Sequence, residues 1–166
     1  VPDGATLAII GKSGSGKSTL MHIMSGLDEP TDGSIVFDDK NITSMKSKQA
    51  DAFRAMEMSF IFQSFFIEAN RTCLDNVMLP MEISKTPRGD RVAKAEAALE
   101  AVELSEKSTV KAKNLSGGQK QRLAIARSTV NEPKLLSAHE PTGNLDSATG
   151  AHVTDTLFSL NTNLGS

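Results

Sequence analysis

The residues from Gly11 to Ser18 combine glycine, lysine and serine at the spacing of a phosphate-binding loop. Their order fits the pattern G-x-x-x-x-G-K-[ST]. Glycines let backbone N–H groups turn inward, where they and a helix N-terminus can surround phosphate oxygens. Lys17 would add positive charge at the outer phosphates, and the Ser18 hydroxyl would ligate Mg²⁺. The segment predicts a nucleoside triphosphate site with contacts from Gly11, Ser13, Gly14, Ser15, Gly16, Lys17, Ser18 and Thr19.

A second glycine segment, Leu115-Ser116-Gly117-Gly118-Gln119, precedes an expected helix. Its serine hydroxyl, its glycine N–H groups and the positive end of that helix also suit an anion. A helix cap would explain the same residues, because Ser-Gly-Gly is ordinary turn chemistry. Two such segments in one chain favour a shared nucleotide, with contacts from Ser116, Gly117, Gly118 and Gln119.

Short apolar runs alternate with amphipathic stretches along the chain, which is typical of a parallel α/β sheet. The run 6–10 is expected to be a buried strand that leads into the phosphate loop. Further strands are expected at 34–37, 59–62 and 134–138. Helices are expected at 17–25, 91–102 and 119–130, and in a last stretch that Asp146 or Ser147 can cap.

The segment from about 64 to 115 differs in residue pattern from the rest of the chain, because it is charged and rich in helical patterns. It is therefore expected to form a helical subdomain. Residues 1–63 and 116–166 would form the core around it, so that the whole chain of 166 residues makes one domain.

Composition narrows the function classes. The net charge of −2 argues against a protein that coats nucleic acid, and a single cysteine, Cys73, excludes an internal disulfide and a cysteine-cluster metal site. No apolar run approaches the roughly 18 residues that a membrane span requires. The chain is therefore expected to be a soluble cytosolic domain.

The two glycine segments together resemble the nucleotide-binding domain of ATP-binding cassette (ABC) transporters. The family's other landmarks follow in order, since Gln63 matches the Q-loop glutamine, Glu140 the catalytic glutamate and 144–146 the D-loop. Residues 140–146, Glu-Pro-Thr-Gly-Asn-Leu-Asp, resemble the corresponding segment in the ABC subgroup that serves lipoprotein release, macrolide export and peptide export. The resemblance covers about residues 1–160 and implies a P-loop NTPase fold.

This resemblance implies a mechanism that uses two copies, or a copy and a paralogue, in a head-to-tail dimer. Each ATP would lie between the phosphate loop of one subunit and Ser116–Gly118 of the other. Glu140 would act as general base on water, while Gln63 would contact Mg²⁺ and report the nucleotide state. The partners would be transmembrane permease subunits, which would hold the domain at the cytoplasmic face of the membrane, in an exporter.

Three features depart from the family pattern. His139 stands where the family has the Walker B aspartate that helps to hold Mg²⁺, a cation that prefers oxygen ligands. His139 is either a substituted strand end with no new role or part of a transition-metal site, for which the sequence shows no partner ligand. No aromatic residue precedes Phe37 to stack on adenine, and the chain stops before the family's switch histidine. A fragment is expected that lacks part of the N-terminal antiparallel β region and the C-terminal end.

The departures leave alternatives to a working transporter ATPase. One is a chain that binds nucleotide and hydrolyses little, because His139 weakens metal binding. Another is an ABC-type ATPase of DNA repair or chromosome structure. That class inserts long coiled coils between the Q-loop and the second glycine segment, whereas Leu115 follows Gln63 by only 52 positions. The spacing favours the transporter class.

Overall fold

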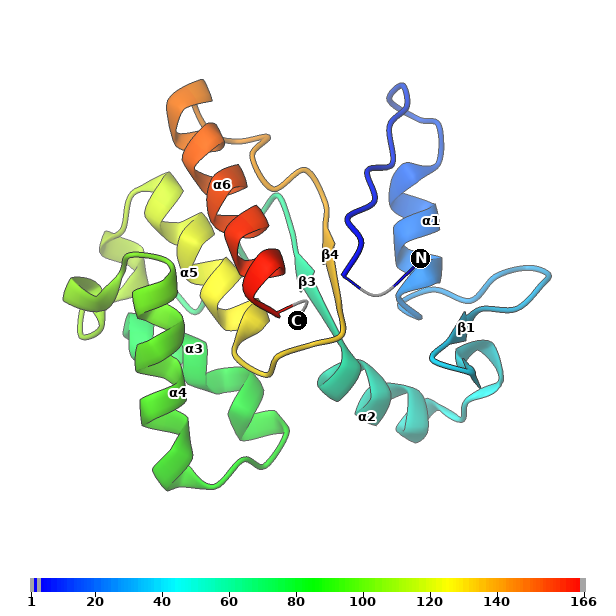
Figure 1. Cartoon of the computed structure of the whole chain (residues 1–166), viewed down its shortest axis with the longest axis horizontal. Helices are drawn as coiled ribbons and strands as arrows, with labels where there is room; N and C mark the ends of the chain where they lie inside the picture. The colour runs from blue at the N-terminus through cyan, green and yellow to red at the C-terminus, as the bar shows by residue number, and fades with distance from the viewer. Residues whose placement is uncertain (1, 3, 165–166) are drawn as a thin grey trace.

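A computed structural model describes residue 2 and residues 4–164 of the chain (Figure 1). In Figure 1 the strands β3 and β4 lie in the middle, with α3 to α6 on one side and α1 on the other. The helices and strands are α1 (Lys17–Met24), β1 (Val36–Phe37), β2 (Lys40–Asn41), α2 (Ser47–Glu57), β3 (Met58–Ile61), α3 (Cys73–Ile83), α4 (Arg88–Ala101), α5 (Gly117–Thr129), β4 (Leu135–Ala138) and α6 (Ser147–Leu164).

The parallel pair of β3 and β4 confirms the expected α/β class. Met58 pairs with Leu135 and Ile61 with Ala138, in the register of a parallel ladder. Two parallel strands need a long crossover connection, and α3, α4 and α5 supply it here. The backbone N–H of His139 also donates to the Ile61 carbonyl at 2.8 Å, so the pairing continues to the end of β4. The strands expected at 59–62 and 134–138 are thus confirmed to within one residue at each end.

The prediction of a buried strand at 6–10 is wrong. These residues are not in a strand, and the side chains of Leu7 and Ile10 are 61% and 92% exposed. An apolar run becomes a buried strand only where a neighbouring strand accepts its backbone hydrogen bonds and a helix covers its face. Within the part of the chain that the structure describes, β3 and β4 pair only with each other.

The main hydrophobic core lies between the crossover helices and α6. Val77 and Met81 on α3, Leu99 on α4 and Leu123 on α5 are fully buried in it. Val153 of α6 is also fully buried, and the partly buried Leu157 and Leu160 pack against the same core at helical spacing. This core fixes the position of α5, and therefore of the glycine segment from which α5 begins.

A smaller unit follows α1 and carries its own apolar cluster. β1 and β2 form an antiparallel hairpin, whose turn residues Asp38 and Asp39 have φ of 49° and 61°. Phe53 of α2 and Ile42 are buried together with Met58 of β3. The sequence reading missed α2, because Phe53 is the only residue of this polar helix that is buried.

Of the helices in the described residues, none is both long and apolar enough to cross a membrane.

Candidate functional site

The loop that precedes α1 is folded around the ammonium group of Lys17. Its Nζ donates to the carbonyl oxygens of Gly11 and Lys12, each at 2.9 Å. Gly14 and Gly16 have φ of 78° and 87°, a region that side chains with a Cβ rarely adopt. The motif that the sequence predicts is therefore closed into a loop, and Lys17 holds its positive charge inside the curve.

The N-terminus of α1 is open to an anion. Gly16 caps this helix without a side-chain hydrogen bond, and the first turn carries no acidic residue. The first N–H groups of a helix have no partner within the helix, so they attract a phosphate oxygen. The loop itself is exposed to solvent, which leaves the phosphate side accessible. Around it lie exposed hydroxyl groups, those of Ser13, Ser15 and Thr19.

The end of β4 meets the start of α1 at one contact. The Oγ of Ser18 lies 3.3 Å from Nε2 of His139, and both side chains are half-buried. The expected Mg²⁺ ligand Ser18 is therefore beside a nitrogen donor. Mg²⁺ takes oxygen ligands in an octahedral shell, and the described residues hold no cluster of three or more histidine, cysteine or acidic side chains. This pair of donors fits Mg²⁺ poorly.

Glu140 lies in the turn directly after that strand end. Its φ is 45°, and the N–H of Gly143 donates to its carbonyl oxygen at 3.0 Å. The residue is exposed, so its carboxylate is accessible to water. A non-glycine residue at positive φ is uncommon and costs energy, which marks the turn as a place where the fold holds an unfavourable conformation.

Gln63 is tied to the same turn and not to Ser18. Its Nε2 donates to Oδ1 of Asn144 at 3.3 Å, and Nδ2 of Asn144 donates back to the Gln63 carbonyl at 3.1 Å. A Cβ added at Gly143 would lie 2.8 Å from Nε2 of Gln63, so a larger residue there would push the end of the Gln63 side chain away. Among the hydrogen bonds of the described residues, none joins Gln63 to Ser18. Gln63 is therefore bonded to the turn after β4, and the sequence did not show Asn144 as its partner.

The second glycine segment is a capped helix start in this structure. Ser116 Oγ accepts from the N–H of Gln119 at 3.3 Å, and Gln119 Oε1 accepts from the N–H of Ser116 at 3.0 Å. A Cβ at Gly118 would come within 2.3 Å of the Thr149 methyl group on α6, so close packing alone requires glycine there. The capping reading is thus borne out for Ser116 and Gln119, and the N–H groups of Gly117 and Gly118 remain as donors toward an anion.

The two glycine segments do not meet within one chain. In Figure 1 the loop before α1 and the start of α5 lie on opposite sides of β3 and β4. A nucleotide held by the loop of one chain therefore cannot also touch Ser116 of the same chain.

A residue that the sequence reading missed connects α5 to the segment after Gln63. Arg127 donates to the Phe66 carbonyl at 2.6 Å and to the Phe65 carbonyl at 3.2 Å. Burial lowers the pKa of its guanidinium group, which nearby Glu68 partly opposes. No pattern in the sequence marks Arg127, because its partners are main-chain atoms more than sixty positions away.

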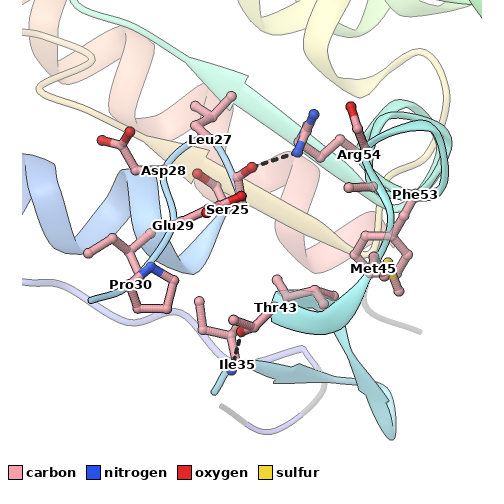
Figure 2. Close-up of a pocket in the computed structure, with 15 residues that line it drawn as sticks. Ser25, Leu27, Asp28, Glu29, Pro30, Ile35, Thr43, Met45, Phe53 and Arg54 are labelled. Carbon is pink, nitrogen blue, oxygen red and sulfur yellow. Dashed lines mark hydrogen bonds between the residues drawn. The ribbon is translucent and has the colours of Figure 1, made fainter. Parts of the chain in front are cut away.

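A hollow of about 260 Å³ lies near the C-terminal end of α1 (Figure 2). Side chains of Leu27, Met45 and Phe53 line it, and Arg54 closes one side by donating to the Gly26 carbonyl. It contains no residue of the phosphate loop, so it is separate from the candidate site.

Comparison with known proteins gives the family context for this geometry. Residues 1–143 match the model of the ABC transporter family. The lipoprotein-releasing system ATP-binding protein LolD of Syntrophus aciditrophicus is 41% identical over 165 residues, which cover 99% of this chain and 74% of that protein. The uncharacterized ABC transporter ATP-binding protein YknY of Bacillus subtilis is 44% identical over 161 residues, covering 97% of this chain and 70% of that protein.

Solved structures agree with the sequence matches. A dimeric, post-hydrolysis structure of the ATP-binding cassette MJ0796, bound to ADP and Pi, superposes with a TM-score of 0.87 at 35% identity. The match covers 99% of this chain and 73% of that one. A second dimeric structure of MJ0796, described as a bacterial ABC transporter cassette, gives a TM-score of 0.87 at 36% identity.

Proposed function

The chain belongs to the ABC transporter family of ATPases, and from that premise we propose that it binds ATP at residues 11–18 to drive a membrane transporter. The observation that carries the proposal is the position of Lys17, whose ammonium group lies inside the loop at the open N-terminus of α1. This arrangement places a full positive charge and unpaired N–H groups around one point. Phosphate oxygens are the ligand that such a point suits best.

We propose that hydrolysis takes place between two chains. Because Ser116–Gln119 lie on the far side of β3 and β4 from the phosphate loop, a second copy or a paralogue must supply them in a head-to-tail dimer. The cassette MJ0796, of similar fold, has been described as a dimer. Ser116 and the N–H groups of Gly117 and Gly118 would then cover the γ-phosphate, and Glu140 would accept a proton from the attacking water.

Gln63 has a signalling role in this proposal. Its amide and main chain are bonded to Asn144, next to the turn that carries Glu140. A movement of that turn on nucleotide binding would pull the chain that follows Gln63. We propose that permease subunits contact this region, which would hold the protein at the cytoplasmic face of the membrane. Residues 64–115 would form the helical subdomain, and 1–63 with 116–166 the core.

We base a proposed direction of transport on the names of the relatives. Four of the similar proteins are ATP-binding proteins of lipoprotein-releasing systems, and their identity to this chain is 41% to 45%. We therefore propose an exporter-type complex, with release of lipoproteins from a membrane as its task.

A second candidate function has its own observation. His139 occupies the position beside Ser18 where an oxygen donor would suit Mg²⁺. The chain would then bind ATP through Lys17 and hydrolyse it slowly. Phosphate release with Mg²⁺ separates the two candidates, since a working ATPase releases phosphate steadily and a binding module does not.

The experiment that tests the site compares Lys17→Ala with Lys94→Ala. Calorimetric titration with ATP should show that Lys17→Ala loses nucleotide binding, because the outer phosphates lose their charge partner. Lys94 is an exposed lysine of α4, far along the chain from the loop, and its removal changes the net charge equally. Unchanged ATP affinity in Lys17→Ala would contradict the proposed site.

A further inference from the structure

We propose that Ser18 and His139 form an oxygen–nitrogen site that, with nucleotide phosphates, prefers first-row transition cations such as Mn²⁺ to Mg²⁺. The proposal rests on the proposed function, because the phosphate oxygens must come from a nucleotide in the loop. The proposed cation preference differs from the Mg²⁺ site that the family resemblance implies. The sequence shows no partner ligand for His139, and the structure supplies one.

The geometry of the pair suits two neighbouring ligands of one ion. Two ligands at right angles and about 2.1 Å from a metal lie about 3.0 Å apart. The distance from Ser18 Oγ to His139 Nε2 is 3.3 Å, so a small adjustment lets one cation bind both atoms.

Both ligands are held by secondary structure. Ser18 lies in the first turn of α1, directly after Lys17. The main chain of His139 is fixed to β3 by the hydrogen bond from its N–H to the Ile61 carbonyl at 2.8 Å. Sites whose ligands come from helix and strand ends keep their geometry when a cation enters. The side chains are half-buried, which still leaves an approach for phosphate and water.

The donor chemistry decides which cation is preferred. Imidazole nitrogen suits zinc, copper, iron and nickel, while Mg²⁺ takes carboxylate, carbonyl and water oxygens. Mn²⁺ accepts oxygen ligands as Mg²⁺ does, and it also accepts an imidazole in mixed sites. A chain with His139 beside Ser18 should therefore gain more nucleotide affinity from Mn²⁺ than from Mg²⁺.

Mn²⁺ is the probe for the experiment because its unpaired electrons report the ligand nuclei. Binding of the β,γ-methylene analogue of ATP is measured by calorimetry without metal, with Mg²⁺ and with Mn²⁺. Pulsed electron paramagnetic resonance of the Mn²⁺ complex then detects a directly bound imidazole ¹⁴N, and ¹⁵N-histidine labelling moves that signal. The variants are His139→Asp, His139→Asn and, as a control, His152→Gln on α6.

The expected result is a ¹⁴N coupling in the parent chain and in His152→Gln that is absent from both His139 variants. The ratio of the affinities with Mn²⁺ and Mg²⁺ should fall by about tenfold or more in His139→Asp, since even a change in a partner outside the first ligand shell alters metal affinity by about 10–100-fold. Circular dichroism confirms that each variant folds. If His139→Asp does not fold, His139→Asn serves as the variant that lacks the imidazole.

Two results would overturn the proposal. One is the absence of an imidazole coupling in the parent chain, which would assign Nε2 of His139 to the Ser18 hydroxyl instead. The other is the same cation preference in the parent chain and in His139→Asp. Failure of the proposed function looks different, because the analogue would then not bind under any metal condition.

Discussion

The carboxylate of Asp146 shows how one residue of the turn after β4 fixes an element. Its Oδ1 accepts from the N–H of Thr149 at 3.0 Å, and its Oδ2 accepts from Oγ1 of Thr149 at 2.6 Å. These bonds cap the first turn of α6, as the sequence predicts. They also favour the charged carboxylate, so the bond from the Thr149 hydroxyl, followed by the bond from its N–H, lowers the pKa of Asp146 below its usual range.

We expect Asp146→Ala to lower the melting temperature at pH 7 by about 2–4 °C, because α6 loses its cap. Since the pKa is lower in the folded chain, the stabilisation is complete above the unfolded value of about 3.9 and is lost as the pH falls through the folded value. The difference between the parent chain and the variant should therefore shrink only in acid. Thermal unfolding followed by circular dichroism at several pH values measures this difference.

The control for this prediction lies on the same helix. Asp155→Ala removes an exposed carboxylate of α6 that makes no side-chain hydrogen bond or ion pair in the described chain, and its melting temperature should hardly change. Equal effects of the two substitutions would show that charge alone, and not the cap, stabilises α6.

At the residue scale, the phosphate loop could be predicted from the sequence, whereas the contacts around it could not. The loop depends on local backbone geometry, so glycine, lysine and serine at fixed spacing are sufficient to indicate it. The contact between Ser18 and His139 joins residues that are 121 positions apart. Only the meeting of β4 with α1 creates it.

Arg127 is the feature that matters most at the scale of elements. It lies near the end of α5 and donates to the main chain at Phe65 and Phe66, which follow Gln63. Phe66 has φ of 45°, and its side chain is 68% exposed. The guanidinium group thus holds this segment in a strained conformation against α5, the helix that Ser116 caps.

We expect Arg127→Gln to lower the free energy of unfolding by about 2 kcal/mol, because two hydrogen bonds from a charged donor are lost. The free energy of unfolding of Arg127→Lys should lie between those of the parent chain and Arg127→Gln, since an ammonium group cannot reproduce the planar fork of a guanidinium group. Urea denaturation gives these values. Lys94→Gln is the matched control, and removal of this exposed charge on α4 should change stability by less than about 0.5 kcal/mol. A loss for Arg127→Gln no larger than that of the control would refute the role of the arginine.

The elements themselves were predictable to different degrees. Helices with a clear apolar stripe were found closely: the bounds of α5 were predicted to within two residues and those of α4 to within three. The run 6–10 was mistaken for a buried strand because its apolar residues satisfy the pattern without a neighbouring strand to pair with them. Burial of a strand is a property of the sheet around it, and the pattern in one segment does not contain that information.

At the scale of the whole molecule, the separation of the two glycine segments sets the condition for activity. The main core binds α5 firmly to α3, α4 and α6, so the segment at Ser116 cannot move to the phosphate loop of its own chain. Neither the spacing of the motifs nor their composition reveals this separation. The resemblance implies a dimer, and the fold gives it a physical reason.

The last prediction tests that dimer directly. Glu140→Gln removes the carboxylate that we propose as the general base. Its loss should slow the proton-transfer step by about 10²–10⁴-fold, so ATP should persist between the two chains. Light scattering should then show a doubled mass on addition of ATP and a monomer without it. The double variant Lys17→Ala, Glu140→Gln should stay monomeric, because the closed state is favoured only through the differential binding of nucleotide. A monomer at saturating ATP in the single variant would mean that Ser116–Gln119 of a second chain do not complete the site, and the glycine segment would then be a helix cap alone.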